Sequence, residues 1–321
     1  MKDSMEPGKI EEKIFKRSVL KYIKQNNSPE EKNRFSTATI VVEDRISILS
    51  GISKAVNNIL AAGAKPEHAV LNLSLPSKTC ESELKELVKY INELCEDSEI
   101  TVSCVEAEVL PCISKPVVTY TCAGSLKNDS FDLRKASPGQ QIVMTKAIGI
   151  EGTAIITARK EECLKERFSS SFLRQCLKFK NHLFIKKEVM LADTLCDLNG
   201  NKLVNAAYNV SDRGIYAALW DLAEEAGCGL MAYLKDIPVW QETIELTELY
   251  DIDPYRMASS GSVLFLTDNG ELLAQKLCEN GVPAAVIGSL EPGNDRVVIS
   301  SDNEKRYLEP PRGDEIYKIF L

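Results

Sequence analysis

Hydrophobic positions follow two alternating spacings along the first third of the chain. The segment TATIVVE, residues 37–43, is rich in β-branched residues and predicts a strand. In the next segment, GISKAVNNILAAGAKP, Ile52, Val56 and Ile59 recur at helical spacing before a glycine and a proline end the pattern. A strand at HAVLNLSLP, a helix at SELKELVKYINELC, and strands at EITVSCVEAEVL and KPVVTYTCAGSL follow. The predicted order over residues 37–126 is therefore β-α-β-α-β-β.

A polar turn segment, DLRKASPGQQ, separates this region from the rest of the chain. We place a domain boundary there, between residues 1–136 and 137–321; 321 residues are consistent with two domains at roughly 150 residues each. Beyond the boundary we expect a strand at 141–147, charged helices within 161–195, and a helix in GIYAALWDLAEEAGCGL. The strands GSVLFLTD, AAVIGSL and RVVISSD follow, with a helix at 270–279. The fold class is α/β, with an α+β second domain.

Composition narrows the functional classes. The chain is 44% hydrophobic and 27% charged, as in ordinary globular proteins, and its net charge is -8. No basic block occurs, which argues against nucleic acid binding, and the lysine-rich start KIEEKIFKRSVLKYIKQ reads as a solvated amphipathic helix. No signal-like segment and no apolar run of about 20 residues is present, so we expect a cytoplasmic protein without membrane spans.

The sequence contains few residues in the spacings that metal sites and nucleophilic catalytic centres require. The ten cysteines form no C-x-x-C pair, and the two histidines, His68 and His182, lack ligand spacing. We therefore expect reduced thiols and no metal site, and no catalytic residue is assigned. Glu106 and Glu108 share one face of a predicted strand and could act as paired carboxylates, although a solvated face is favoured. The letters GCGLMA imitate a dinucleotide fingerprint, but the segment follows a helix, which favours a helix C-cap at Gly227.

Two corners of the second domain are candidates for ligand binding. In TKAIGIEGTAII, two glycines flank Ile150-Glu151 just after a strand that ends near Lys146; an ordinary turn is the favoured reading of this segment alone. The loop Asn209 to Gly214 runs into a helix, and backbone N–H groups at helix starts commonly hold phosphate. This corner carries an Asn and an Arg where a nucleotide site would want a carboxylate and a Gly.

The order and spacing of several segments resemble the aminoimidazole ribonucleotide (AIR) synthase superfamily, and in particular its HypE-like members. These segments are AVNNILAAGAKP, KPVVTYTCAG, SPGQQIVMTKAIGIEGTAII, GIYAALWDLAEEAGCGL, DIDPYRMASSGSVLFLTD and LEPPRGDEIYKIF. The resemblance implies a PurM-like two-domain fold, a homodimer whose N-terminal sheets form a barrel, and a cleft for Mg-ATP. It also implies phosphoryl transfer to a small substrate, or its activation, as in thiamine-monophosphate kinase, selenophosphate synthetase and the hydrogenase maturation factor HypE.

The chain departs from the family pattern at several corners of that cleft. The segment NNSPEEKNRFSTAT stands where the family has an acidic glycine-containing loop, and the first acidic corner keeps only Asp44. An amide, Asn58, replaces a carboxylate on the following helix, and only Glu108 survives of the corner that usually contains two glycines and a histidine. The phosphate-side corner reads Asn209-Val210-Ser211-Asp212-Arg213-Gly214. The candidate ligand-binding residues are Asp44, Asn58, Glu108, Lys146, Glu151, Asn209, Asp212 and Arg213.

These departures predict a degenerate Mg-ATP site. Each lost carboxylate removes on the order of 4 kcal/mol of attraction for a nearby unit charge, before desolvation. The leading hypothesis is a homodimeric, non-catalytic binding or regulatory protein, with ATP and Mg²⁺ not expected to bind tightly. The alternative is an active ATP-dependent enzyme with altered ligands. Arg213 could still hold a nucleotide or another phosphate-bearing small molecule without metal. The C-terminal cysteine through which HypE acts is missing, since the last cysteine is Cys278.

The sequence does not name a protein partner or a substrate. For the homodimer, the N-terminal strands should leave a sheet face and edges uncovered in a single chain. We expect Val102, Val117 and Val118 near the dimer interface.

Overall fold

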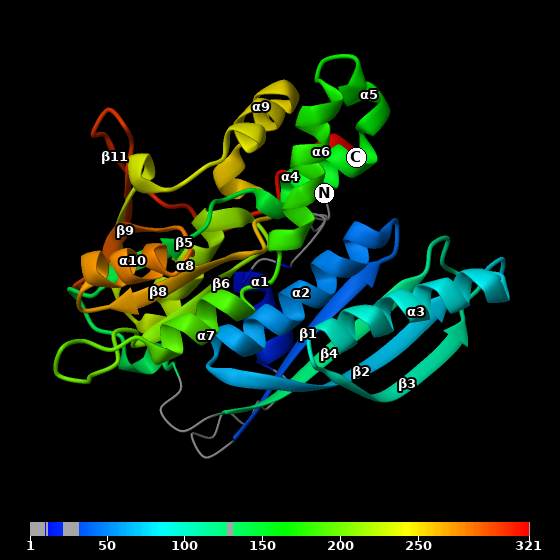
Figure 1. Ribbon diagram of the computed structural model, residues 1–321, viewed down its shortest axis with the longest axis horizontal. Helices are drawn as coiled ribbons and strands as arrows, with labels where there is room; N and C mark the ends of the chain where they lie inside the picture. Colours follow the sequence, from blue (N-terminus) through cyan, green and yellow to red (C-terminus); the bar gives the residue numbers. More distant parts are fainter. Residues whose placement is uncertain (1–9, 11, 22–31, 127–130, 321) are drawn as a thin grey trace.

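The computed structural model describes residues 10, 12–21, 32–126 and 131–320. The N-terminal part is a four-stranded sheet with the order β1-β4-β2-β3 and two helices on one face (Figure 1). Its elements are β1 (Asn33–Val41), α2 (Arg45–Ala61), β2 (Ala64–Leu75), α3 (Glu81–Asp97), β3 (Thr101–Val109) and β4 (Val117–Leu126). The predicted β-α-β-α-β-β order is confirmed.

The helices bury the face that the hydrophobic spacing predicted. Ile52 and Ile91 are fully buried, and Ile59 is 1% exposed. The opposite face of the sheet is open: Phe35 and Val41 on β1 and Val70 on β2 are 65%, 50% and 44% exposed. Because β-strand side chains alternate, one sheet serves both a core and an uncovered surface.

The expected interface positions divide between these two faces. Val117 pairs with Val41 and therefore belongs to the open face. Val118 pairs with Ile40 and is fully buried in the core, so it lies on the helix-covered side of the sheet and not on the open face. Val102 is partly buried against the same core. The period-2 alternation of VVTY was the signal that separates the two neighbouring valines.

The C-terminal part contains a seven-stranded sheet with the order β11-β10-β7-β9-β5-β8-β6. Its strands are β5 (Gln141–Thr145), β6 (Ala206–Val210), β7 (Gly229–Tyr233), β8 (Ser262–Thr267), β9 (Ala284–Glu291), β10 (Arg296–Ile299) and β11 (Lys305–Tyr307). The helices are α4 (Ile150–Arg159), α5 (Glu161–Lys165), α6 (Ser170–Lys178), α7 (Lys186–Thr194), α8 (Gly214–Ala226), α9 (Gln241–Tyr250), α10 (Gly270–Glu279) and α11 (Tyr317–Phe320). As predicted, Gly227 caps α8, with φ of 64°.

The two parts share one hydrophobic core. Side chains of α2, such as Ile52, belong to the same buried cluster as Ile156 of α4 and Leu183. A second cluster lies within the C-terminal part and includes Leu219 of α8 and Leu264 of β8. The shared cluster keeps α2 against the C-terminal part, and this contact forms the walls of the cleft described below.

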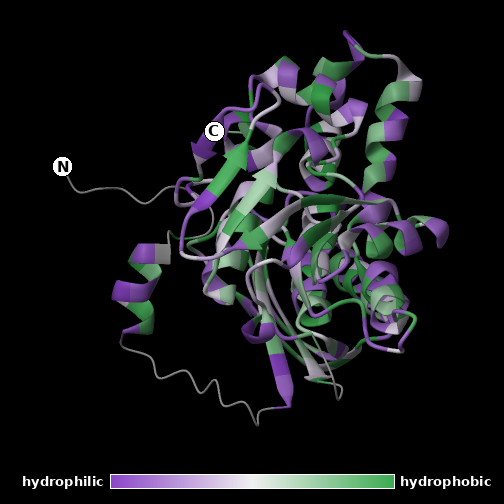
Figure 2. Cartoon of the chain, turned by 90° about the vertical axis from the view of Figure 1, so that its left-hand side faces the viewer, coloured by the Kyte–Doolittle hydropathy of each residue, from purple (hydrophilic) through white to green (hydrophobic). Residues whose placement is uncertain are grey.

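The N-terminal segment lies beside the main body of the molecule (Figure 2). It consists of a short helix α1 (Glu12–Phe15) and a following turn of π-helix (Lys16–Leu20). Lys16 pairs with Glu224 of α8 at 2.8 Å, and Phe15 is 38% exposed. The predicted helical character of this segment is confirmed over residues 12–20.

The cysteine side chains and the lengths of the helices match what the sequence indicated. All ten cysteines are free thiols, as the scattered spacing predicted. Among the residues that the structure describes, no helix is both long and apolar enough to cross a bilayer.

Candidate functional site

A cleft separates the outer face of α2 from the corner between β6 and α8. It encloses a cavity of about 310 Å³. Its polar lining comes from α2, from β6 with the following loop, and from α8: Lys54, Asn58, Tyr208, Asn209, Ser211, Asp212, Arg213, Asp221 and Glu225. The structure therefore brings together four of the predicted site residues, namely Asn58, Asn209, Asp212 and Arg213.

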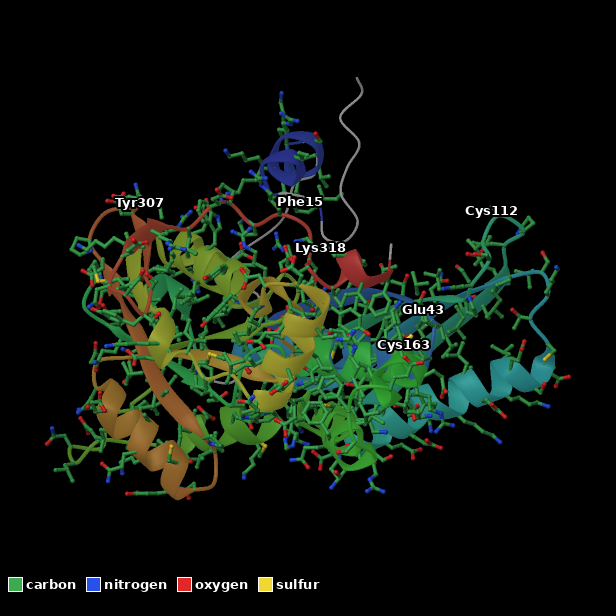
Figure 3. The ribbon with its side chains drawn as sticks, turned by 90° about the horizontal axis from the view of Figure 1, so that it is seen from above. Phe15, Glu43, Cys112, Cys163, Tyr307 and Lys318 are labelled. Atoms are coloured by element: carbon green, nitrogen blue, oxygen red, sulfur yellow. The ribbon has the colours of Figure 1, made fainter. Side chains whose placement is uncertain are left out.

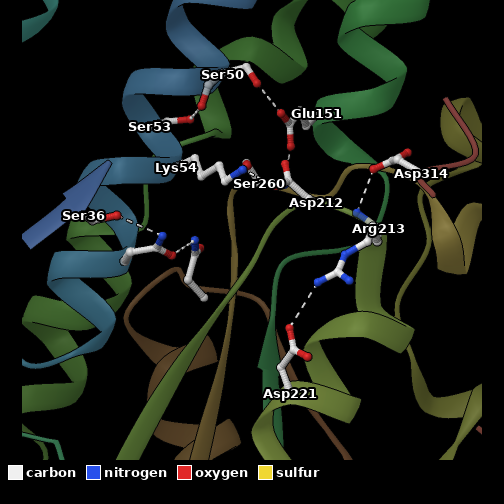
Figure 4. A network of polar contacts seen from close by, with 12 residues as sticks. Ser36, Ser50, Ser53, Lys54, Glu151, Asp212, Arg213, Asp221, Ser260 and Asp314 are labelled. Atoms are coloured by element: carbon white, nitrogen blue, oxygen red, sulfur yellow. Dashed lines mark hydrogen bonds and ion pairs between the residues drawn. The ribbon is translucent and has the colours of Figure 1, made fainter. Parts of the chain in front are cut away.

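Three polar side chains of α2 span this cleft as a ladder. Ser50, Lys54 and Asn58 are spaced four residues apart, which places them on one face of a helix. Each meets a different residue of the C-terminal part (Figure 4). The Ser50 hydroxyl donates to the Glu151 carboxylate, Lys54 forms an ion pair with Asp212, and Asn209 Nδ2 donates to Asn58 Oδ1 at 2.8 Å.

The middle contact of the ladder is an ion pair between the Lys54 ammonium and the Asp212 carboxylate. Both side chains are partly buried, with 28% and 30% of their surface exposed. An ammonium group thus lies against the Asp212 carboxylate, which the sequence marked as a candidate ligand-binding group of the corner. Lys54 was missed in the sequence, although it lies one helical turn before Asn58, on the face where a site residue was already expected.

The amide pair forms the lower rung. Asn58 Nδ2 donates to the Ser36 hydroxyl of β1 at 3.1 Å, while its Oδ1 accepts from Asn209. Asn209 is 5% exposed, and its own Oδ1 accepts no hydrogen bond from the described residues. A single hydrogen bond joins two neutral amides here, where two carboxylates would repel unless a cation lay between them.

Arg213 shapes the corner at the start of α8. Its backbone is left-handed, with φ of 61°, an uncommon conformation for a residue with a side chain. Its side chain is 6% exposed and its Nη2 lies 3.4 Å from the Asp221 carboxylate, while Nε has no partner among the described residues. The next residue, Gly214, has φ of 68°, and a Cβ there would lie 2.4 Å from the Tyr255 carbonyl oxygen. The arginine is accommodated because the glycine that follows permits the tight turn.

Glu151 lies at the upper end of the ladder. It is 4% exposed, and its second oxygen accepts the Ser260 backbone N–H at 2.9 Å. This carboxylate is therefore held by α2 and by the loop before β8 together. The sequence marked Glu151 between two glycines without indicating which groups it would meet.

The remaining predicted residues lie outside the cavity lining. Asp44 is the N-cap of α2: it accepts from Ser47 N at 2.7 Å and from Arg159 Nε at 2.9 Å. Glu108 lies on β3, where its carboxylate is 3.5 Å from the Ser74 hydroxyl. Glu106 pairs with Asn72 and Glu108 with Ser74, so the two carboxylates share one face of the sheet, as expected.

Lys146 is a buried structural cation. It is 7% exposed, with φ of 54°, and its ammonium donates to the carbonyl oxygens of His182 and Phe184 and pairs with Glu188 at 3.1 Å. Burial lowers its pKa, although the nearby Glu188 carboxylate opposes that shift. Lys146 thus joins the end of β5 to the segment before α7, away from the cleft.

The described part of the chain contains no group of three or more His, Cys, Asp or Glu side chains that could hold a metal ion. Of the segment that replaces the family's acidic loop, residues 26–31 lie outside the described residues, and residues 33–39 form part of β1.

Comparisons with known proteins place both parts of the chain in one family. Residues 49–126 match the AIR synthase related protein N-terminal domain, and residues 137–300 match its C-terminal domain. A putative hydrogenase expression/formation protein of Methanocaldococcus jannaschii is 23% identical over 275 residues, which cover 84% of this chain and 77% of the relative.

Two solved structures share the fold. HypE in a HypE–HypF complex superimposes with a TM-score of 0.72 at 16% identity, covering 88% of this chain and 92% of HypE. HypE in complex with ATP gives a TM-score of 0.68 at 15% identity, covering 98% of each chain. The expected two-domain, PurM-like fold is confirmed, with the N-terminal sheet open in the single chain.

Proposed function

Because the chain belongs to the AIR synthase related family, we propose that it is a HypE-like member whose cleft does not hold Mg-ATP. It would act as a non-catalytic binding or regulatory protein. The observation that carries this proposal is the ion pair between Lys54 and Asp212, which gives the carboxylate of the Asn209–Gly214 corner a cation from the protein itself.

The donor set of the cleft fits Mg²⁺ poorly. Magnesium prefers hard oxygen ligands, usually one or two carboxylates together with phosphate oxygens. Asp212 is already paired with Lys54, and Asn58 and Asn209 bind each other. Of the two further carboxylates in the lining, Asp221 and Glu225, the first lies 3.4 Å from Arg213 Nη2. Mg²⁺ next to Asp212 would also meet the Lys54 ammonium, which at about 4 Å and an effective dielectric of 20 repels each unit of the ion's charge by on the order of 4 kcal/mol.

The charge of the lining also argues against a triphosphate. Two cationic side chains, Lys54 and Arg213, line the cavity together with three acidic ones, Asp212, Asp221 and Glu225. Phosphate sites ordinarily combine helix-start N–H groups with a surplus of positive charge. A small ligand held by Arg213 without metal suits this lining better than a nucleotide triphosphate with its magnesium.

Assembly is the second part of the proposal. The related HypE forms a complex with HypF. By analogy we propose that the present chain also acts through a protein partner, and that it is a homodimer paired through the open face of its N-terminal sheet. Exposed Phe35, Val41 and Val70 supply the apolar surface that a second copy would cover.

The experiment is a thermal shift with millimolar Mg-ATP. A ligand at 100 times its Kd stabilises the native state by about 2.7 kcal/mol, which is roughly 5–10 °C for a chain of this size. We expect the wild-type Tm to rise by less than about 2 °C on that scale. The triple variant Asn58→Asp, Asn209→Asp and Arg213→Gly should recover part of the shift, and adding Lys54→Met should increase it further. Asn72→Asp, an amide-to-acid change on the open sheet face, is the matched control and should recover none.

The alternative is an ATP-dependent enzyme, which the HypE–ATP structure makes worth testing directly. It predicts a large wild-type shift with Mg-ATP and hydrolysis above background. In that case Asp212→Asn should abolish hydrolysis, whereas Asn72→Asp should not. Either a large wild-type shift or Asp212-dependent hydrolysis would overturn the non-catalytic proposal.

A further inference from the structure

A second cavity lies between the N-terminal helical segment and α8, beside the cleft. It measures about 370 Å³. Its lining combines apolar and charged side chains of residues 10–20 with polar ones of β6, α8 and the corner between them: Ile10, Phe15, Lys16, Leu20, Tyr208, Arg213, Asp221, Glu224 and Glu225. Four of these residues, Tyr208, Arg213, Asp221 and Glu225, also line the cleft. The cleft therefore continues beneath the N-terminal segment.

The N-terminal segment makes the far wall of this second cavity apolar. Phe15 and Leu20 are five residues apart, a spacing that an α-helix of 3.6 residues per turn would place on different faces. The segment instead contains a π turn, in which Lys21 N donates to Lys16 O at 3.0 Å, and such i→i+5 bonds bring Phe15 and Leu20 toward one face. Figure 3 shows Phe15 on the side of the segment that faces the body. Ile10 and Phe15 are 41% and 38% exposed, so apolar surface is left for a ligand to cover.

The cleft contains two buried polar groups without a partner. Arg213 is 6% exposed, and its Nε donates to no acceptor among the described residues. Asn209 is 5% exposed, and its Oδ1 accepts no hydrogen bond from that part of the chain. The Arg213 side chain points along the cleft toward Asp221, whose carboxylate lies 3.4 Å from Nη2 (Figure 4). A buried donor or acceptor without a partner is costly, so a ligand that supplies both partners gains affinity from each.

These two groups select the head group of such a ligand. Arg213 Nε needs an acceptor, and Asn209 Oδ1 needs a donor. A carboxylate or phosphate head supplies acceptors only and an ammonium supplies donors only, whereas an amide or a hydroxyl supplies both. The charges agree, because the joined lining has three basic and four acidic side chains: Lys16, Lys54, Arg213, Asp212, Asp221, Glu224 and Glu225. The lining thus offers no surplus of positive charge to an anion.

We propose that the cleft and the second cavity form one site for an uncharged amphipathic small molecule. Its amide or hydroxyl head lies between Asn209 and Arg213, and its apolar part lies against Phe15 and Leu20. The two cavities, of about 310 and 370 Å³, each reach the size of small-molecule sites, roughly 300–1,000 Å³. This inference rests on the proposed function, because it assigns to the same cleft a ligand that needs no magnesium. It extends that function by giving the N-terminal segment a role in binding.

The first test compares three ligands that share one alkyl chain and differ in the head group, in calorimetric titrations without divalent metal or nucleotide. The wild type should bind octanamide at least about 10-fold more tightly than octanoate or octylammonium, since only the amide supplies both a donor and an acceptor. Shortening the amide should weaken binding roughly fourfold for each CH₂ removed, because less apolar surface is buried. Octanamide that does not bind at about 1 mM, or that binds no better than the two ions, would overturn the proposal.

The second test replaces apolar residues of the N-terminal segment. Phe15→Ser and Leu20→Ser should each weaken octanamide binding by about 5-fold or more, because each removes apolar surface that the alkyl chain covers. Val19→Ser is the matched control: Val19 belongs to the same π turn but does not line the second cavity, so its replacement should leave the affinity unchanged. An affinity that neither lining variant lowers would contradict the placement of the apolar part beneath this segment.

The third test separates the head of the ligand from its apolar part. Asn209→Ala removes the acceptor and should weaken octanamide binding by about 5-fold. The apolar fluorescent probe N-phenyl-1-naphthylamine needs only the second cavity, which Asn209 does not line, and should bind the variant and the wild type equally. Equal losses for the two ligands, or no loss for octanamide, would refute the placement of the head. A wild-type response to Mg-ATP would instead refute the proposed function, and none of these three tests contains magnesium or nucleotide.

Discussion

At the scale of single residues, the interaction to measure is the one between Lys54 and Asp212. A partly buried ion pair retains more Coulomb energy than an exposed one, because less water screens it. Asp212 and Glu151 both lie close enough to Asp314 for their charges to raise its pKa. Removing Lys54 therefore leaves Asp212 near other carboxyl groups without the cation that balances it.

A double-mutant cycle with Lys54→Met and Asp212→Asn should give a coupling energy of about 0.5–1 kcal/mol in urea unfolding. The control cycle is Lys165→Met with Glu162→Gln, an ion pair on α5 whose side chains are 48% and 88% exposed. Its coupling should be about 0.3 kcal/mol or less. If the cleft pair couples no more strongly than this surface pair, Lys54 does not neutralise Asp212 in the way proposed.

The sequence identified some of the residues that line the cleft. Asn58, Asn209, Asp212 and Arg213 were expected together and line one cavity. Lys54 was not identified, because a charged residue on a helix gives no sign of its partner until the fold brings the two together. Lys146 is the converse case, a residue that the sequence marked as a candidate but that lies outside the cleft. It follows β5 beside the GIEG corner, yet its ammonium is buried against carbonyl groups.

At the scale of elements, α2 has to be held at both ends for its ladder to stay in register. The N-terminal end is fixed by a capping box, in which Asp44 and Ser47 each bind the other's backbone N–H. Asp44 also binds Arg159, which comes from the end of α4. One side chain thus starts the helix and joins it to the C-terminal part.

Asp44→Ala should lower the free energy of unfolding by about 1–2 kcal/mol, since it removes an N-cap. Asp44→Asn keeps a cap and should cost less. Ser169→Ala, at the start of α6, removes a cap that has no ion pair and is the matched control. A loss for Asp44→Ala below about 0.5 kcal/mol would contradict the anchoring role, since typical caps are worth more than that.

Long periodic elements were the predictable ones. The helical faces of α2, α3 and α8 follow from spacing alone, and a polar turn lies between the two sheets where DLRKASPGQQ indicated one. The ends were less predictable: the strand expected at 37–43 is β1, at Asn33–Val41, because pairing with β4 continues beyond the β-branched run. Pairing partners come from distant sequence, which a local pattern does not contain.

At the scale of the whole molecule, the N-terminal sheet is the feature that a single chain leaves incomplete. Its two edges are β1 and β3, and its open face carries Phe35, Val41 and Val70. Exposed edges and apolar faces favour association with another chain. The four-stranded sheet has helices on one face only, so a second copy of the chain is the simplest cover for the other.

We therefore expect a homodimer at micromolar concentration, measured by light scattering. Val41→Arg and Val70→Arg each place a charge on the open face, which should be unfavourable in a buried interface, and should shift the protein toward monomer without lowering Tm by more than about 2 °C. Leu198→Arg, in an exposed turn of the C-terminal part, is the control and should remain dimeric.

A wild-type protein that stays monomeric would contradict the pairing. A wild-type dimer that both variants leave intact would show that the two chains meet through a different surface. In the expected outcome, the sheet that supports α2 on one face holds the second subunit on the other, so dimer formation and cleft geometry depend on the same four strands.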